Sequence, residues 1–193
     1  MIAAIHEALE AHRRVAEALR DHFADPIGKA AEAIIAAYRR GGKLLVMGNG
    51  GSAADAQHFA AELVGRYRRE RRALPAIALT TDTSILTSVS NDYGYTEVFR
   101  RQVEAHAAAG DVVVGISTSG NSENVARALA LAREMGAVTI VLGGGDGGSL
   151  KAMADIALIV PSAETPRIQE AHITIIHILC DVVEASLAGE AKP

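Results

Sequence analysis

The sequence predicts an α/β fold, a doubly wound five-stranded parallel sheet with an N-terminal helical extension. After residue 40, short apolar runs alternate with helical segments. These runs are apolar throughout, not at every second position, which is typical of parallel strands covered on both faces. With 193 residues, 49% of them apolar and 22% charged, the chain is long enough to bury such a core as one compact domain.

Two helices are predicted within residues 1–40, because apolar residues recur there at helical spacing. We expect the break between them near "DHFADP", where Asp25 precedes Pro26. The glycine of "RRGG" at Gly41 is typical of the position just after a helix C-cap. Residues 41–193 then form the sheet domain.

Strands are predicted at 43–47, 75–80, 111–116, 137–142 and 155–160, with helical segments between them and a last helix over 164–187. In flavodoxin-like and Rossmann-like sheets of this kind, ligands bind at the carboxyl ends of the strands. The first four strands are followed by "GNGGS", "TTDTS", "STSGNS" and "GGGDGGS". Two of these segments are rich in hydroxyl groups and two in glycine, which suits a phosphorylated, polyhydroxylated ligand.

The first segment, "GNGGSA", matches a dinucleotide-binding fingerprint, which is a weak signal alone. A dinucleotide site also needs an acidic residue about 20 positions further on. The acid that closes the second strand is Asp82, 34 residues after Gly48, so this interpretation is disfavoured. A tight turn without a ligand stays open as an alternative for this stretch.

The third segment offers four hydroxyl groups where a strand ends and a helix begins, on Ser117, Thr118, Ser119 and Ser122. Hydroxyl groups and helix N-terminal N–H groups together bind a phosphate dianion well. Helix capping by Ser122 or Asn121 is the alternative, although a cap needs one such residue rather than four. A serine-hydrolase elbow is excluded because Ser119 replaces its last glycine, and no nucleoside-triphosphate P-loop motif is present.

Two helices carry candidate ligands and proton-transfer groups. "HFAAE" places His58 and Glu62 on one helix face, where they could bind a metal, share acid–base chemistry or form a surface salt bridge. Gln169, His172 and His177 lie in the apolar stretch "RIQEAHITIIHILC" and therefore need partners. A buried histidine bonded to the backbone is an equal alternative for His172.

The arginine-rich run "RYRRERR" begins at Arg66. Such a run is typical of a solvated helix end or loop. Arg66 lies one turn after Glu62, however, and could neutralise an anionic substrate.

Composition argues against several classes of partner. Aromatic residues make up 4% of the chain, there is no tryptophan, and the net charge is −4, which disfavours nucleic acid. No apolar run is long enough for a membrane span, and charges interrupt "MIAAIHEALEAHRR" before a signal-peptide core forms. The single cysteine, Cys180, excludes an internal disulfide and is expected in the core. We therefore expect a cytoplasmic protein.

Four motifs in order, "GNGGSAADAQHFAAELVGRY", "TTDTSILTSVSNDYGY", "STSGNSENV" and "RIQEAHITIIHIL", resemble the family of sedoheptulose 7-phosphate isomerases, also called phosphoheptose isomerases, which have the sugar-isomerase (SIS) fold. The resemblance extends from about residue 40 to 187. It implies conversion of sedoheptulose 7-phosphate to D-glycero-D-manno-heptose 7-phosphate, the first step toward ADP- or GDP-heptose for lipopolysaccharide or another glycan. It also implies a homotetramer with active sites at subunit interfaces, to which the N-terminal helices would contribute, and one zinc ion per subunit.

Residue by residue, the resemblance implies three sets of positions. The proton-transfer pair is Glu62 and His177, and the zinc ligands are His58, Glu62, Gln169 and His177. The implied substrate contacts, to which we add Ser52 and Arg66, are Asn49, Gly50, Gly51, Glu62, Asn91, Asp92, Ser117, Thr118, Ser119, Ser122 and Gln169.

Gln169 and His177 are eight residues apart on one predicted helix, which is about 12 Å of axial rise. We therefore expect one of them to reach the metal from a neighbouring subunit. Two other functions compete with the heptose enzyme. One is a non-catalytic SIS tetramer that binds a replication initiator, and the joint presence of the four zinc positions argues against it. The other is an isomerase or a sensor of another sugar phosphate.

Overall fold

The sheet of this protein has five parallel strands in the order β2-β1-β3-β4-β5. The computed structural model describes residues 1–189, and residues 190–193, which close the predicted domain 41–193, lie outside the described residues. The strands are β1 Leu44–Gly48, β2 Ala76–Ala78, β3 Val112–Ser117, β4 Val138–Gly144 and β5 Ile156–Val160. The predicted doubly wound parallel sheet is confirmed, in the strand order typical of flavodoxin-like folds.

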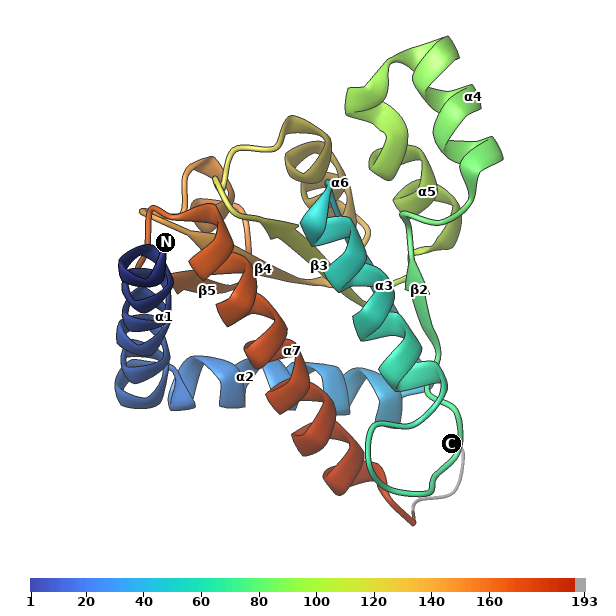
Figure 1. The fold of residues 1–193 in the computed structure, drawn as a ribbon. Helices are drawn as coiled ribbons and strands as arrows, with labels where there is room; N and C mark the ends of the chain where they lie inside the picture. The colour runs from blue at the N-terminus through green and yellow to red at the C-terminus, as the bar shows by residue number, and fades with distance from the viewer. Residues whose placement is uncertain (190–193) are drawn as a thin grey trace.

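Helices cover both faces of the sheet, so the fold has three layers (Figure 1). One face packs against α1 Ile2–His22, α2 Ala24–Arg39, α3 Gly51–Val64 and α7 Thr165–Leu187. The other face packs against α5 Val98–His106 and α6 Glu123–Glu134, with the 3₁₀ turn η2 Ser149–Ala152. α4 Thr83–Tyr93 and the 3₁₀ turn η1 Tyr95–Glu97 lie beside α5, and α4 has no fully buried residue. No described helix is both long and apolar enough to span a membrane.

The predicted break near "DHFADP" is confirmed, since it falls at Phe23, while Pro26 lies in the first turn of α2, where the backbone nitrogen has no helical hydrogen-bond partner. Two other local predictions need correction. β2 has three residues rather than six, since it is an edge strand that pairs with β1 alone. β4 and β5 are joined by the four-residue η2 in place of a full helix.

The strand order has its switch point between β1 and β3, which are neighbours although β1 is followed in sequence by β2. The connections that follow two such strands leave the sheet in opposite directions, which opens a crevice at the carboxyl ends of the strands. The register pairs Gly48 with Ile116, so the loop that starts at Asn49 and the loop that starts at Thr118 leave the sheet side by side. This crevice is where the predicted ligand-binding segments meet.

Candidate functional site

A pair of side-chain amides joins the loops that follow β1 and β3. Asn49 Nδ2 donates to Asn124 Oδ1 over 3.0 Å, and Asn124 Nδ2 donates to Asn49 Oδ1 over 2.9 Å. Asn124 Oδ1 also accepts the backbone N–H of Val125 at 3.0 Å, which sets the orientation of both amides because a backbone N–H can only donate. The hydroxyl of Tyr95 therefore donates to Asn49 Oδ1 over 3.1 Å. One amide hydrogen of Asn49 is not used in this network.

The hydroxyl-rich loop gathers its side chains at the start of α6. Ser117 Oγ lies 2.9 Å from Ser122 Oγ and 3.5 Å from Ser119 Oγ. Ser122 stands at the N-cap position of α6, yet its side chain makes no capping hydrogen bond. Simple helix capping therefore does not explain these hydroxyl groups. A pocket of about 210 Å³ opens beside them, with Thr118 and Ser119 in its lining.

The glycine turn brings α3 close to α7. Gly50 has φ +56°, a conformation that favours glycine. A Cβ added to Gly51 would lie 2.9 Å from Cδ of Gln169 and nearer still to its Nε2, so the Gln169 amide packs directly over the first residue of α3. Ser52 is buried, and its Cβ packs against Gly48. The structure thus places Gln169 at the mouth of the first loop.

Two turns further along the same helices, the predicted acid–base groups meet. His58 Nε2 lies 2.9 Å from His177 Nε2 and 3.4 Å from Glu62 Oε1. One imidazole donates a hydrogen bond to the other, and the ring of Tyr67 packs against His177 with centroids 5.5 Å apart and a 31° angle between the ring planes. A single chain therefore brings together three of the four predicted zinc positions, with Gln169 held at Gly51.

The donor types of this cluster are those of a zinc site, two imidazoles and a carboxylate. The 3.4 Å spacing also suits neighbouring ligands around one tetrahedral ion with bonds of about 2.0–2.1 Å, whereas the 2.9 Å between the two imidazoles is a direct hydrogen-bond distance. Within residues 1–189, however, no group of three or more His, Cys, Asp or Glu side chains is arranged to hold a metal ion. A single chain thus offers suitable donors that are not yet in a complete ligand geometry.

Two groups near the site, the buried His172 and the half-buried Asp55, have shifted pKa values. Burial lowers the pKa of His172 to about 4, and its Nε2 contacts the Gly143 carbonyl at 3.0 Å, so His172 is a neutral core residue bonded to the backbone. Burial raises the pKa of Asp55 to about 6, against the opposing effect of His58. Asp55 Oδ2 is buried without a hydrogen-bond partner. Cys180 is buried as predicted.

Other predicted contacts lie at the rim. Asn91 and Asp92, at the exposed C-terminal end of α4, are hydrogen-bonded to each other, and Tyr95 connects this segment to the first loop. Arg66 is exposed, and its Nε lies 3.8 Å from Glu70. The structure does not bring Arg66 to Glu62, so its role in binding stays a prediction.

Sequence reasoning missed four residues that organise the site: Asn124, Tyr95, Arg71 and Glu184. Arg71 belongs to the run interpreted as a solvated loop, but its side chain is 1% exposed and pairs with the buried Glu184. A signal was present in principle, because a glutamate within the apolar last helix needs a cation. The partner could not be chosen from five neighbouring arginines without the fold.

A crevice that combines an amide-fixed loop, clustered hydroxyl groups and a histidine–carboxylate pair defines a sugar-phosphate-binding α/β protein. The family model for the SIS domain matches residues 9–144, and the chain belongs to this family. The chain is 64% identical to the phosphoheptose isomerase of Citrifermentans bemidjiense over 192 residues, which cover 100% of both chains. It is also similar to the solved phosphoheptose isomerases of Neisseria gonorrhoeae (45% identity, TM-score 0.90) and Francisella tularensis (38% identity, TM-score 0.93), each covering 95% of this chain and 98% of the other.

Proposed function

We propose that the protein is an aldose–ketose isomerase that converts sedoheptulose 7-phosphate to D-glycero-D-manno-heptose 7-phosphate. The similarity to phosphoheptose isomerases covers the full chain and supports this reaction. The observation that carries the proposal is the contact between His58 on α3 and His177 on α7, because His58 also lies 3.4 Å from Glu62, so the proposed base and the proposed proton carrier share one neighbour. Both helices begin at the hydroxyl-lined crevice, so binding and chemistry share one wall.

The reaction moves a carbonyl from C2 to C1 through an enediol, by removing a proton from C1 and returning one to C2. Glu62 acts as the base at carbon, since a carboxylate within reach can accept this proton. His177 transfers protons between the substrate oxygens, because an imidazole can both donate and accept near neutral pH. The contact with His58 orients the ring of His177. No redox cofactor is required, because the substrate supplies both carbons that change oxidation state.

Phosphate binding falls to the hydroxyl cluster after β3. The Oγ atoms of Ser119 and Ser122 both lie within 3.5 Å of Ser117 Oγ, and the N-terminus of α6 adds a favourable dipole. The unused amide hydrogen of Asn49 supplies a neighbouring donor for a sugar oxygen. These contacts fix which end of the sugar reaches Glu62.

We further propose one zinc ion per subunit, held by His58, Glu62, His177 and Gln169. Such an ion supplies Lewis-acid stabilisation of the developing negative charge on the substrate oxygens. Gln169 of the same chain packs over Gly51, about 10 Å along α3 from His58 by helix rise. We therefore propose that the Gln169 ligand comes from a neighbouring subunit.

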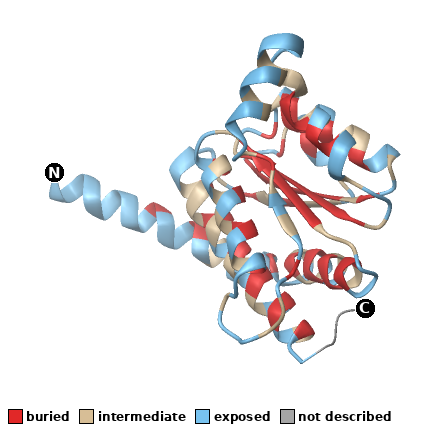
Figure 2. Cartoon of the chain, turned by 90° about the vertical axis from the view of Figure 1, so that its right-hand side faces the viewer, coloured by how far each residue is buried: buried red, intermediate tan, exposed pale blue. Residues whose placement is uncertain are grey.

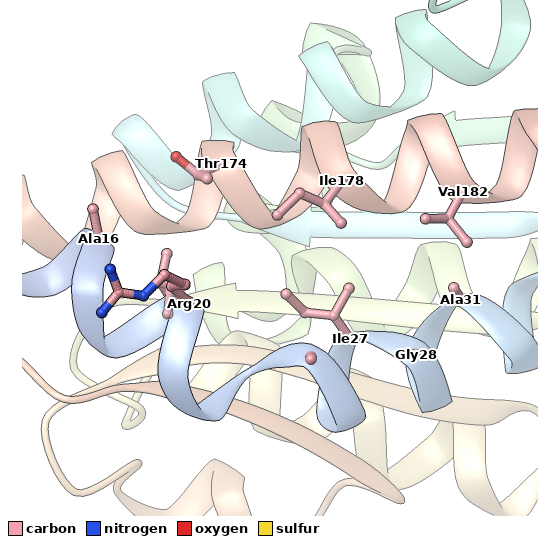
Figure 3. Close-up of a pocket in the computed structure, with 10 residues that line it drawn as sticks. Ala16, Arg20, Ile27, Gly28, Ala31, Thr174, Ile178 and Val182 are labelled. Atoms are coloured by element: carbon pink, nitrogen blue, oxygen red, sulfur yellow. The ribbon is translucent and has the colours of Figure 1, made fainter.

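Assembly into a homotetramer is supported by apolar surface on the N-terminal helices. Ile2, Ile5 and Leu9 are exposed at helical spacing on α1, which projects from the body of the protein (Figure 2). A groove of about 460 Å³ between α1, α2 and α7 is also apolar, with Ile27, Ile178 and others directed into it (Figure 3). A second copy of this chain would cover both surfaces. Substituting Leu9→Glu should then give a smaller species in light scattering, whereas an unchanged mass would remove α1 from the interface.

The test of the function is to incubate purified protein with sedoheptulose 7-phosphate, with and without a chelator, and to follow the aldose product. Turnover that stops with chelator, returns with zinc and is absent in Glu62→Gln supports the proposal. No turnover in the presence of metal would leave the non-catalytic initiator-binding protein or another sugar phosphate as the function, and full turnover in Glu62→Gln would reject the base. The cytoplasmic location and the heptose-containing glycan stay predictions.

Subunit sharing has its own test. Mixed oligomers of Gln169→Ala and His177→Ala chains should regain activity, since a neighbour's Gln169 completes a site that has an intact His177. Mixed oligomers of His58→Ala and His177→Ala chains are the control, because these residues meet within one chain. Equal failure of both mixtures would place Gln169 and His177 of the same chain in one site.

A further inference from the structure

A buried ion pair joins α7 to the loop that follows α3. Arg71 Nε lies 3.3 Å from Glu184 Oε1, and the two side chains are 1% and 0% exposed. Removing two charges from water is unfavourable unless the pair makes further hydrogen bonds. The surroundings of both residues supply them.

Glu184 accepts three backbone hydrogen bonds from the loop. The N–H groups of Tyr67, Arg68 and Arg69 donate to its carboxylate over 2.9, 2.7 and 2.7 Å. Burial alone would raise the pKa of Glu184, but these N–H groups and Arg71 outweigh it and hold the pKa below its usual range. Glu184 is therefore a charged anchor for the loop.

Arg71 caps the C-terminal end of α3. Its Nη2 donates to the Glu62 carbonyl over 2.9 Å, and its Nη1 donates to the Leu63 carbonyl over 2.8 Å. α3 ends at Val64, so Glu62 lies in the last turn, whose carbonyl groups lack helical partners. A guanidinium group at this position satisfies these carbonyls and opposes the negative end of the helix dipole. Leu63 is buried in the core and its carbonyl also accepts the Leu74 N–H, whereas Arg71 is the group that donates to the Glu62 carbonyl.

The pair also connects the two catalytic helices. Glu184 follows His177 by seven residues on α7, which is two turns and nearly the same helix face. Arg71 thus links the backbone of Glu62 to the helix of His177 through one buried contact. We propose that Arg71 and Glu184 are positioning residues for the isomerisation, which hold the last turn of α3 so that the Glu62 carboxylate keeps its place relative to His177. This inference rests on the proposed function.

The competing explanation is that the pair only stabilises the fold. A matched control exists at the opposite ends of the strands, where the buried Asp111 pairs with Lys43 Nζ at 2.6 Å and accepts backbone N–H groups of Lys43 and Ala108. Glu184→Gln and Asp111→Asn make the same chemical change to similar carboxylates. Both variants are expected to lower the melting temperature.

Only Glu184→Gln is expected to lower kcat, by at least tenfold with KM within twofold of the original, because it displaces the base and leaves the phosphate loop intact. Amide hydrogen exchange at Leu63, Val64 and Gly65 should accelerate at least tenfold in the same variant and remain unchanged in Asp111→Asn. Wild-type kcat in folded Glu184→Gln, or equal loss of kcat in both variants, would overturn the proposal.

If Glu184→Gln does not fold, the double variant Arg71→Met/Glu184→Met tests the same proposal. Apolar side chains of similar size often replace a buried ion pair without loss of stability. A folded double variant should show the same fall in kcat and the same faster exchange at the end of α3, and wild-type values would overturn the proposal. If the unmodified protein does not turn over sedoheptulose 7-phosphate, the proposed function fails. The exchange data then still decide whether the pair holds the Glu62 turn.

Discussion

Substituting Gly51→Ala separates activity from stability at the point where α3 meets α7. The new Cβ would lie 2.9 Å from Gln169 Cδ and closer to Nε2, whereas ordinary contacts begin at 3.4 Å. The Gln169 amide is the flexible end of a side chain and must move by about 1 Å, a displacement that can lower a rate by about 100-fold when the group is part of a reacting site. Gly51 is the first residue of α3, and alanine restricts the unfolded chain more than glycine does, so alanine there should preserve or raise stability, by about 0.4–1 kcal/mol.

The assay is a double-mutant cycle on kcat/KM, with thermal unfolding measured in parallel. We expect Gly51→Ala to lower kcat/KM by about 10- to 100-fold without lowering the melting temperature. The same substitution made in a Gln169→Ala background should have no further effect, because the displaced amide is already absent. Full activity in Gly51→Ala, or independent losses that multiply in the double variant, would refute the argument that Gly51 acts through Gln169.

Three further predictions concern stability, the loop and the binding network. Burial lowers the pKa of His172 to about 4, so between pH 6.5 and 4 the unfolded chain binds a proton that the folded chain does not, and the free energy of unfolding decreases as the pH is lowered. In denaturant titrations this decrease should be about 3 kcal/mol smaller in His172→Gln than in the unmodified protein, and equal decreases would contradict the assignment. Gly120 has φ +66°, which disfavours alanine, and a Cβ there would lie 2.8 Å from the backbone nitrogen of Gly148, so Gly120→Ala should lower the melting temperature sharply. An unchanged melting temperature would contradict the loop geometry. Asn124→Asp cannot donate to Asn49, so it should raise KM at least tenfold with kcat within twofold; an unchanged KM would remove the network from substrate binding.

The fold was predictable because its signals are local. Each of the five apolar runs became a strand within a few residues of its predicted range, and the parallel sheet was predicted because these runs are apolar throughout, which fits the complete burial of β1 and β3. The errors arose where neighbouring elements decide the outcome. Pro26 could end one helix or begin the next, and only packing at Phe23 distinguishes these. The β4–β5 connection is glycine-rich, and the length of its helical segment could not be predicted from its sequence.

The site was predictable only in part, for a physical reason. Polar residues at strand ends must gather at the switch point, so Asn49 and Ser117 could be placed from the sheet alone. Asn124 and Tyr95 act through contacts 75 and 46 residues away in sequence, which no local pattern encodes. Arg71 resembles its neighbours in sequence and differs from them only by its burial against α7.

The pairing of α3 with α7 explains how one chain can contain the site and still leave it incomplete. The helices lie side by side and run in the same direction: Gly51 faces Gln169, His58 faces His177, and the loop after α3 meets Glu184. Because both helices rise by about 1.5 Å per residue, the eight-residue separation of Gln169 and His177 is matched by the seven-residue separation of their partners. Bringing Gln169 to His177 within one chain would break this register along its whole length. This register is the reason we propose that the Gln169 side chain completing the histidine cluster comes from another subunit, and the exposed stripe on α1 is the contact surface we propose for that association.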